Sequence, residues 1–534
     1  MSRTVTQSGK QWLICWSTGD PAFTDLLAGI KDLPSRRYDA DKFGWLCPAT
    51  GELLAICEQF EFDGRDQLRA TVEAKSAPVE LTADQLQRLA ELEPKLLPWQ
   101  PAAVNQLAIA LGAGSALDAS STGVGKTFTS LATCAVLNRP AYVVCPKAVI
   151  PQWRAAAAHF GIELAGVCNY ELLRRGEQPA VTTRKETYNY AGVEKTRNVA
   201  EWKLPADTII IFDECHRLAN PKTSNTSLGL AALRQGYTVL GMSATAADNP
   251  LQMKFSGLLT GLFDDERGWW TWAQSNGVVK GKFGYKFDGR LAHLARIHSR
   301  IFPSRGNRVR IADLGDAFPE TQIAAECYDL NGEGRKIQKV YEEMSVELDR
   351  LARKTARDAD DENPLTVRLR ARQKVETLKV PGIAEMAQDA IDSGMGVAIF
   401  VNFNETADAL CEKLKTKCVI RGGQSADDRA KCIAEFQADR EPIIVCNIKA
   451  GGVGVSLHGS PTARMRLAII FPTDSGTDLK QALGRVWRAQ GAKSIQRIVF
   501  AAGTIEEQVC DNVRRKIKRI DMLNDGELDE ALSF

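Results

Sequence analysis

The stretch IIIFDECH, Ile209–His216, decides the fold class of this chain. Its first four residues are apolar, as in a strand buried on both faces of a parallel sheet. Two adjacent carboxylates, Asp213 and Glu214, follow at the end of the predicted strand. Carboxylates at the end of such a strand are costly unless a cation lies beside them. The stretch therefore predicts either a cation site or a simple acidic cap on the strand.

A candidate phosphate-binding loop precedes this strand. ASSTGVGKT, Ala119–Thr127, opens a predicted helix, and its glycines allow backbone N–H groups to close around phosphate oxygens. Lys126 is placed to reach the β- and γ-phosphates of a nucleotide. Ser120 stands where the strict motif G-x-x-x-x-G-K-[ST] has its first glycine. A glycine-rich helix start without a ligand is the alternative.

The two stretches together favour a nucleotide site. Mg²⁺ held by Thr127 and Asp213 would supply the cation that the strand end requires. Glu214 could then polarise the water that attacks the terminal phosphate. The pair of stretches therefore predicts ATP and Mg²⁺ as cofactors.

A third stretch, QALGRVWRAQG, lies near the end of the chain. On a helix its Gln481, Arg485 and Arg488, spaced i, i+4 and i+7, would share one face. Two guanidiniums on one face favour a dense anion opposite them. We interpret this anion as the γ-phosphate of ATP held by the earlier block, and the arginines as arginine fingers. A solvated basic face is the alternative.

Alternating apolar strands and helical stretches indicate an α/β protein with two tandem parallel-sheet lobes. The strands of the first are AYVVCP, TIIIFDE and TVLGMSAT, and those of the second are GVAIFVNF, PIIVCN, RLAIIFP and IQRIVF. We predict a small α/β module at 1–65, a linker at 66–94, lobe 1 at 95–315 with an inserted hairpin at about 180–203, a helical linker at 316–380 and lobe 2 at 381–534.

Bulk composition is that of an ordinary folded protein of 534 residues, with 44% hydrophobic and 25% charged residues. A net charge of +2 neither requires nor excludes a nucleic-acid partner. The chain shows no signal peptide and no apolar run of membrane-spanning length, so we expect no membrane association. Its 13 cysteines include no C-x-x-C pair, which favours a reducing compartment such as the cytoplasm.

The order of these motifs resembles that of the superfamily 2 helicases and translocases, and within them the SWI/SNF-like branch. LLPWQPAAVNQL, STGVGKT, VVCPKAVIPQW, DECHRLANPKTSNTS, GMSATAADNPLQ, CNIKAGGVGVSLHG, QALGRVWRAQG and GTIEEQV follow one another as in that branch. The resemblance implies two RecA-like lobes with ATP between them. It also implies that the catalytic residues are Lys126, Glu214, Gln481, Arg485 and Arg488. The nucleotide-binding residues that it implies are Gln100, Ser120, Thr122, Gly123, Val124, Gly125, Lys126, Thr127 and Gly454.

The first module, through IKDLPSRRYDADKFGWLCP, is similar to the HARP domain that precedes the motor in annealing helicases. Similar small modules precede many phage and bacterial motors, so we expect a bacterial or phage-infected host cytoplasm. The resemblance implies a monomeric, DNA-stimulated ATPase that moves along duplex DNA and anneals strands or remodels forks and branches. A single-strand-binding protein is a candidate partner. Alternatives are a strand-separating helicase on DNA or RNA, and a remodeller that removes RNA polymerase from DNA.

Candidate nucleic-acid contacts follow from the same resemblance and from residue type. Motor lobes contact the nucleic-acid backbone with hydroxyls and basic side chains at strand ends. We predict such contacts for Lys147, Thr245, Lys449, Arg305 and Arg308. In the first module, Arg36, Arg37 and Trp45 could bind DNA by charge and stacking, although a packed hairpin with surface arginines explains them almost as well.

Overall fold

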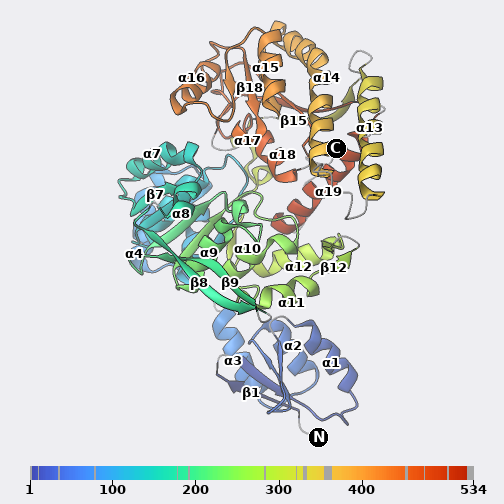
Figure 1. Ribbon diagram of the computed structural model, residues 1–534. Coiled ribbons are helices and arrows are strands. Elements are labelled where there is room, and N and C mark those ends of the chain that lie inside the picture. The colour runs from blue at the N-terminus through green and yellow to red at the C-terminus, as the bar shows by residue number, and fades with distance from the viewer. Residues whose placement is uncertain are drawn as a thin grey trace.

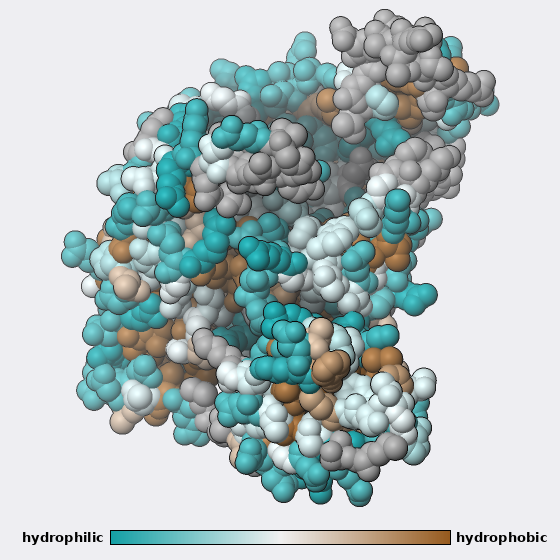
Figure 2. Space-filling view, turned by 60° about the horizontal axis from the view of Figure 1, so that its bottom comes forward, coloured by the Kyte–Doolittle hydropathy of each residue, from teal (hydrophilic) through white to brown (hydrophobic). Residues whose placement is uncertain are grey.

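The computed structural model arranges the chain as a small N-terminal module below two stacked lobes (Figure 1). It describes residues 3–9, 11–33, 36–76, 80–176, 178–190, 193–281, 284–319, 321–328, 333–353, 364–451, 455–473, 475–501, 504 and 506–525. The face shown in Figure 2 is mostly hydrophilic or neutral, with small scattered hydrophobic patches.

The N-terminal module is an antiparallel sheet with helices packed against it. Its four strands have the order β1-β2-β4-β3, with bounds Thr4–Ser8, Gln11–Cys15, Gly44–Cys47 and Arg37–Asp39. Its helices are α1 (Phe23–Asp32), α2 (Gly51–Gln59) and α3 (Arg65–Ser76). Helix α3 packs against α2 and β1 and places Leu68 in the module's core. The predicted linker thus begins as a helix of this module.

The second half of that segment belongs to lobe 1. Helix α4 (Ala83–Leu92) starts with a capping box between Thr82 and Gln85. It packs against α6, and its Leu89 is buried in a lobe 1 core. Only three residues between α3 and α4, 77–79, lie outside the described ranges.

Lobe 1 is built on a six-stranded parallel sheet. The order is β14-β5-β11-β10-β6-β7, with bounds Gly306–Asn307, Ala116–Asp118, Thr238–Met242, Ile209–Asp213, Ala141–Cys145 and Gly166–Asn169. The helices are α5 (Gln100–Gly112), α6 (Lys126–Val136), α7 (Ile150–Phe160), α8 (Tyr170–Arg175), α9 (Ser224–Arg234) and α10 (Lys254–Leu259). Along β10, Ile209 and Ile211 enter one hydrophobic core while Ile210 and Phe212 enter the other. Both faces of this strand are therefore covered, which explains its continuous apolar run.

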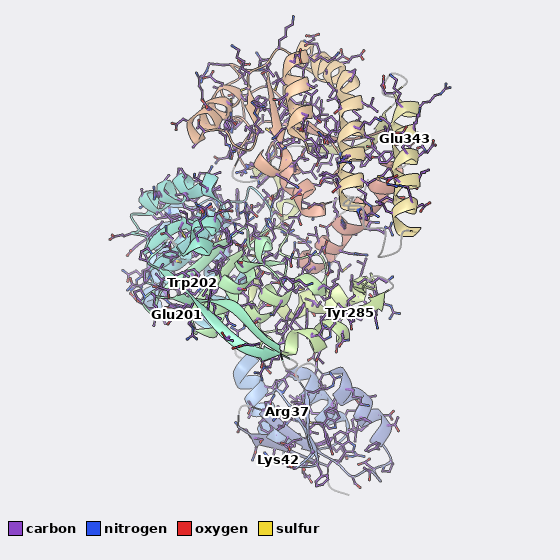
Figure 3. All side chains as sticks on the ribbon, in the orientation of Figure 1. Arg37, Lys42, Glu201, Trp202, Tyr285 and Glu343 are labelled. Carbon is purple, nitrogen blue, oxygen red and sulfur yellow. The ribbon has the colours of Figure 1, made fainter. Side chains whose placement is uncertain are left out.

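Two insertions extend lobe 1. Strands β8 (Val181–Tyr190) and β9 (Val193–Trp202) form an antiparallel hairpin that leaves the body of the lobe (Figure 1). Trp202, labelled in Figure 3, closes the hairpin's base, where its indole donates to the Leu228 carbonyl. A second insertion consists of α11 (Gly268–Ser275), β12 (Val278–Gly281), β13 (Gly284–Phe287) and α12 (Leu291–Ile301).

Lobe 2 repeats the parallel architecture. Its sheet has the order β15-β20-β19-β16-β18-β17, with bounds Thr321–Tyr328, Ser494–Ala501, Arg466–Ile470, Gly396–Val401, Ile443–Asn447 and Val419–Ile420. Its helices are α13 (Gly334–Arg353), α14 (Pro364–Asp392), α15 (Asn404–Lys413), α16 (Ala426–Gln437), α17 (Ile448–Gly451), α18 (Gly476–Leu483) and α19 (Glu506–Asp525). Strand β15 lies within the predicted helical linker but pairs with β20, so part of that segment is built into the lobe 2 sheet.

The predicted fold class, two tandem RecA-like parallel-sheet lobes in an α/β chain, is confirmed. Short 3₁₀ turns occupy Glu93–Lys95, Lys147–Val149, Cys215–Leu218, Pro250–Gln252 and Ile311–Ala317. Among the helices that the structure describes, none combines the length and apolar character needed to cross a membrane. The cysteines whose side chains the structure describes are free thiols.

Candidate active site between the lobes

The loop Ala119–Gly125 joins β5 to α6 at the carboxyl end of the lobe 1 sheet. Gly123 and Gly125 both have φ near +89°, a left-handed conformation that glycine adopts without strain. A Cβ on Gly125 would lie 2.3 Å from Nε2 of Gln100, so only glycine fits there. The Lys126 ammonium donates to the carbonyls of Ser120 (2.8 Å) and Ser121 (3.0 Å), which places it inside the curve of the loop.

Gln100 supports the loop from the start of α5. Its side chain is 1% exposed; the amide oxygen accepts from Leu97 N at 2.8 Å, and the amide nitrogen donates to the Gly125 carbonyl at 3.1 Å. The adjacent Trp99 donates its indole N–H to the Val124 carbonyl at 3.1 Å. The structure thus brings Gln100 against the phosphate-binding loop, together with a tryptophan that the sequence analysis did not single out.

The carboxylates of the DECH stretch lie at the end of β10 in one connected network. Asp213 accepts from the Trp153 indole at 3.0 Å, and its backbone carbonyl accepts from the Tyr170 hydroxyl at 2.7 Å. Burial and the neighbouring Glu214 raise the pKa of Asp213 to about 6. A cation beside Asp213 would therefore stabilise the ionised form of its carboxyl group.

Glu214 adopts a left-handed backbone conformation, with φ of +54°, which turns its side chain out of the strand direction. Its carboxylate lies 3.2 Å from Nδ1 of His216. Burial opposes ionisation of Glu214, but the hydrogen bond from His216 and the charges of His216, Arg485 and Lys126 outweigh it and lower the pKa to about 2. Glu214 is thus ionised at neutral pH, and a carboxylate with so low a pKa is only a weak proton acceptor.

The predicted helix through QALGRVWRAQG is shorter than expected. Helix α18 ends at Leu483, and Arg485 and Arg488 lie beyond it. The Arg485 carbonyl accepts from Leu457 N at 2.9 Å, a long-range bond that replaces the next turn of helix. The shared direction of the two arginines is nevertheless present, since both guanidiniums donate to the Val455 carbonyl, at 3.3 and 3.1 Å.

The two lobes meet at this point. The Gln481 amide donates to the Glu214 carboxylate across the interface at 3.3 Å. A Cβ on Gly123 would lie 3.0 Å from Cγ of Arg488, and one on Gly484 would lie 2.7 Å from Cβ of Thr122. Lobe 2 is therefore closed directly onto the phosphate-binding loop.

The residues at this interface fit a nucleoside triphosphate with Mg²⁺. Burial and the charge of Arg485 lower the pKa of Arg488 to about 9, and burial also lowers the pKa values of Arg485 and Lys126. Such a convergence of one buried and two partly buried cations is stabilised by a polyanion between them. Thr127 directly follows Lys126, whose charge acts on Asp213, so Thr127 and Asp213 are candidate Mg²⁺ ligands. Within the described ranges, no group of three or more His, Cys, Asp and Glu side chains is arranged to hold a metal by itself, so phosphate oxygens would have to complete the coordination.

Of the remaining nucleotide-site predictions, Ser120, Thr122 and Val124 lie in the loop itself, and Gly454 lies outside the described residues. The Ser120 hydroxyl accepts from Val309 N and from the Asn307 amide, both at 3.0 Å. Ser120 therefore anchors the loop to the strand beside it, a role that explains a serine in place of the first glycine.

The predicted nucleic-acid contacts divide into two groups. Lys147 and Lys449 are exposed at the carboxyl ends of β6 and β18, as expected. Thr245 is 2% exposed, with its hydroxyl inside lobe 1. The contact predicted for Thr245 stays a prediction, and in this closed arrangement of the lobes its side chain is buried in lobe 1.

The contacts predicted for Arg305 and Arg308 also stay predictions, and both side chains have partners within the protein. Arg305 donates to the Ala113 carbonyl at 2.7 Å, at the amino end of β5. Arg308 forms a two-point ion pair with Asp525 at 2.6 and 2.9 Å, and its side chain is 13% exposed. Both side chains make contacts within the protein, which the basic character of the sequence could not reveal.

An aromatic stack that the sequence analysis missed also joins the lobes. Phe318 lies between Trp99 of lobe 1 and Trp487 of lobe 2, with ring centroids 6.1 and 5.9 Å apart. Trp487 also donates to the Pro319 carbonyl at 2.8 Å. The position of both tryptophans next to motif residues, Gln100 and Arg488, was the available signal.

This geometry defines a class of protein: a two-lobed ATPase whose site is completed at the lobe interface. Comparison with known families gives the same result. Residues 93–248 match the family described as "Type III restriction enzyme, res subunit", and residues 382–490 match the "Helicase conserved C-terminal domain". The chain belongs to the superfamily 2 helicases and is an ATP-hydrolysing enzyme.

Similar proteins fall into two groups. A protein of Acanthamoeba polyphaga mimivirus named "Putative ATP-dependent RNA helicase L364" is 33% identical over 465 residues, covering 82% of this chain and 85% of that protein. The SWI/SNF-related matrix-associated actin-dependent regulator of chromatin subfamily A-like protein 1 of Xenopus laevis is 23% identical, covering 95% of this chain and 53% of that protein. The chain thus spans about half the length of this SWI/SNF-related protein. Among solved structures, S. cerevisiae Dbp5 bound to RNA and ADP BeF3 matches with a TM-score of 0.41 and 12% identity, over 82% of this chain and 91% of Dbp5.

Proposed function

We propose that this protein is an ATP-driven translocase on duplex DNA of the SWI/SNF-like type, which anneals strands or remodels forks and branches. The observation that carries the proposal is the closed interface, where Arg485 and Arg488 of lobe 2 face the phosphate-binding loop and the carboxylates of lobe 1. Because the site is complete only when the lobes meet, each hydrolysis cycle would be tied to a movement of one lobe against the other.

The roles we assign follow from this geometry. Lys126 and the loop N–H groups would bind the phosphates, with Gln100 fixing the loop. Glu214 would accept a proton from the attacking water, and Arg485 and Arg488 would stabilise the charge that develops on the transferred phosphoryl group. Mg²⁺ bound through Thr127 and Asp213 would supply further positive charge at the phosphates.

Duplex DNA as the track is supported by the SWI/SNF-related relatives, whose likeness extends over nearly the whole chain, including the N-terminal module. Lys147 and Lys449 offer one exposed cation on each lobe for backbone contacts. A cleft of about 950 Å³ between the module and lobe 1 is lined by Arg36, Arg37, Trp45 and other residues. Arg37, labelled in Figure 3, lies on the module's hairpin. The module could therefore hold a nucleic-acid strand beside the motor by charge and stacking.

A strand-separating RNA or DNA helicase is the second candidate. It is favoured by the name of the mimivirus relative and by the Ser243-Ala244-Thr245 form of the motif after β11. Both functions use the same ATP site, so only the nucleic-acid substrate and the mechanical product can separate them.

The test compares ATP turnover with single-stranded DNA, duplex DNA, forked DNA, single-stranded RNA and duplex RNA. Displacement of a third strand from a DNA triplex reports translocation, and a tailed duplex reports unwinding. We expect duplex or forked DNA to stimulate turnover, the third strand to be displaced and bubbles coated with single-strand-binding protein to close. Preferential stimulation by RNA with release of single strands would support the second candidate, and the Lys126→Ala variant serves as the inactive control.

A further inference from the structure

The last helix, α19, belongs to both lobes at once. In Figure 1 it runs from beneath α18 toward α12 of lobe 1. Its middle is fixed to lobe 2, where Ile517 enters a core cluster and Asp521 pairs with Lys480 of α18. Its end is fixed to lobe 1, where Leu523 enters the large core cluster. A 20-residue helix is roughly 30 Å long and stiff, so its two attachments cannot move independently.

The final turn of α19 holds two loops of the ATP site. The Asn524 amide donates to the carbonyl of Ala244, in the Ser243-Ala244-Thr245 loop, at 2.8 Å. The Asp525 carboxylate accepts two hydrogen bonds from Arg308, at 2.6 and 2.9 Å. Asn524 is 2% exposed and the Asp525 side chain 4%, so both contacts are shielded from water. Shielded, charge-assisted contacts of this kind hold a fixed geometry better than surface pairs do.

Arg308 extends the connection to the phosphate-binding loop. The same guanidinium donates to the carbonyl of Ala119, the first residue of ASSTGVGKT. Residues 305–309 also run beside the start of this loop, with Ala119 N donating to Asn307 O and Ser121 N to Val309 O, both at 2.9 Å. A continuous set of contacts therefore leads from lobe 2, through Asp525 and Arg308, to the loop that carries Lys126.

We propose that Arg308, Asn524 and Asp525 are positioning residues for ATP hydrolysis. They transmit the position of lobe 2 to the phosphate-binding loop and to the Ser243-Ala244-Thr245 loop. When lobe 2 brings Arg485 and Arg488 to the site, the last turn of α19 packs against lobe 1. The phosphate-binding loop and the Ser243-Ala244-Thr245 loop are thereby fixed at the same time. This inference rests on the proposed ATP site and does not depend on which nucleic acid is the track.

The test uses the full chain and the variants Asp525→Ala, Asn524→Ala and Asp525→Glu. Asp313→Ala is the control, because Asp313 forms a two-point pair with Arg310 at 2.9 and 2.7 Å within lobe 1, although this pair is exposed to solvent. For each variant, kcat and KM for ATP are measured with and without the stimulating nucleic acid. Thermal unfolding establishes that each variant is folded.

We expect Asp525→Ala to raise KM for ATP and to reduce nucleic-acid stimulation, each by about fivefold or more, the range of typical coupling between sites. Asp525→Glu should restore most of the loss, Asn524→Ala should show a smaller form of it, and Asp313→Ala should behave as wild type.

An unchanged KM and stimulation in folded Asp525→Ala would overturn the proposal, as would an equal effect of Asp313→Ala. If Asp525→Ala does not fold, Asn524→Ala decides by the same two measurements. If no nucleic acid stimulates even the wild type, the proposed translocase function fails, but the KM for ATP still tests the positioning role. The two failures are therefore distinguishable.

Discussion

Lobe 1 and lobe 2 share one architecture but contribute opposite charges to the site. Lobe 1 places the carboxylates Asp213 and Glu214 at a strand end beside the loop of Lys126. Lobe 2 places two arginines there, and the hydrogen bonds they form within the lobe include those to the Val455 carbonyl. Each lobe therefore holds charged side chains at the interface. Their charge would be balanced by the opposite charges of the other lobe and by the phosphates of a bound nucleotide. Lobe 1 should therefore contribute to both nucleotide binding and turnover, whereas the arginines of lobe 2 should contribute mainly to turnover.

The largest expected effect tests the contribution of lobe 2. Arg488→Ala should reduce kcat by about 10³–10⁵, because an arginine finger acts on charge that develops in the transition state. ATP affinity, measured by equilibrium binding, should change only a few-fold. Arg464→Ala, which removes an exposed arginine of the same lobe, is the control and should leave kcat unchanged. Normal turnover in Arg488→Ala would show that the lobes do not divide the chemistry in this way.

Glu214→Gln tests the carboxylate of lobe 1 that faces lobe 2. Loss of a general base should lower kcat by about 10²–10⁴, while ATP remains bound because the phosphate contacts are intact. Single-turnover hydrolysis together with retention of labelled ATP measures both effects. Glu171→Gln is the matched control, since Glu171 pairs with Arg217 nearby in lobe 1. Rapid release of ATP from Glu214→Gln would argue that Glu214 holds the nucleotide instead.

Lys126→Ala should differ from both variants by affecting binding as well as rate. Removing a preorganised cation from the site should lower kcat by about 10²–10³. ATP affinity should fall in parallel, because Lys126 contacts phosphates in the ground state too. Titration with a fluorescent ATP analogue measures the binding loss. Affinity equal to wild type would place Lys126 in the same functional group as Arg488 and remove the proposed difference between the lobes.

Features that depend on a few consecutive residues could be predicted from the sequence. The loop around Gly123 and Lys126 was predictable because its residue types meet local requirements of backbone conformation and phosphate binding. The buried strand before Asp213 was predictable from its apolar run. Both signals lie within a few consecutive residues.

Features that depend on distant partners were not predictable. The burial of Arg308 depends on Asp525, 217 residues away. The end of α18 depends on the bond between Leu457 N and the Arg485 carbonyl, so the helical spacing of the arginines was misleading. Thr245 matched a surface motif by type but lies inside the lobe. For Arg308 and for the end of α18, a long-range contact overrides the local pattern.

Gly484→Ala tests the fit between the lobes without altering a reacting group. The backbone of Gly484 has φ of −75°, which alanine adopts freely, but the added methyl would meet Cβ of Thr122 at 2.7 Å. Displacement of lobe 2 by a fraction of an ångström or more should lower kcat by up to about 10², with little change in thermal stability. Thr122→Gly in the same chain should relieve part of the loss. Additive effects of the two substitutions would show that they do not meet across the interface.

The smallest effect is expected at Gln481, which touches lobe 1 without carrying charge. Its amide donates to Glu214 at 3.3 Å, a long bond of the kind worth about 0.5–1.5 kcal/mol. Gln481→Ala should therefore reduce kcat by roughly 3–10-fold, in line with that energy. Gln481→Glu should be more damaging than the alanine variant, because it brings a second carboxylate toward the partly buried Glu214. If the glutamate variant is as active as wild type, the lobes do not approach this closely during turnover, and the closed interface is not the hydrolysing state.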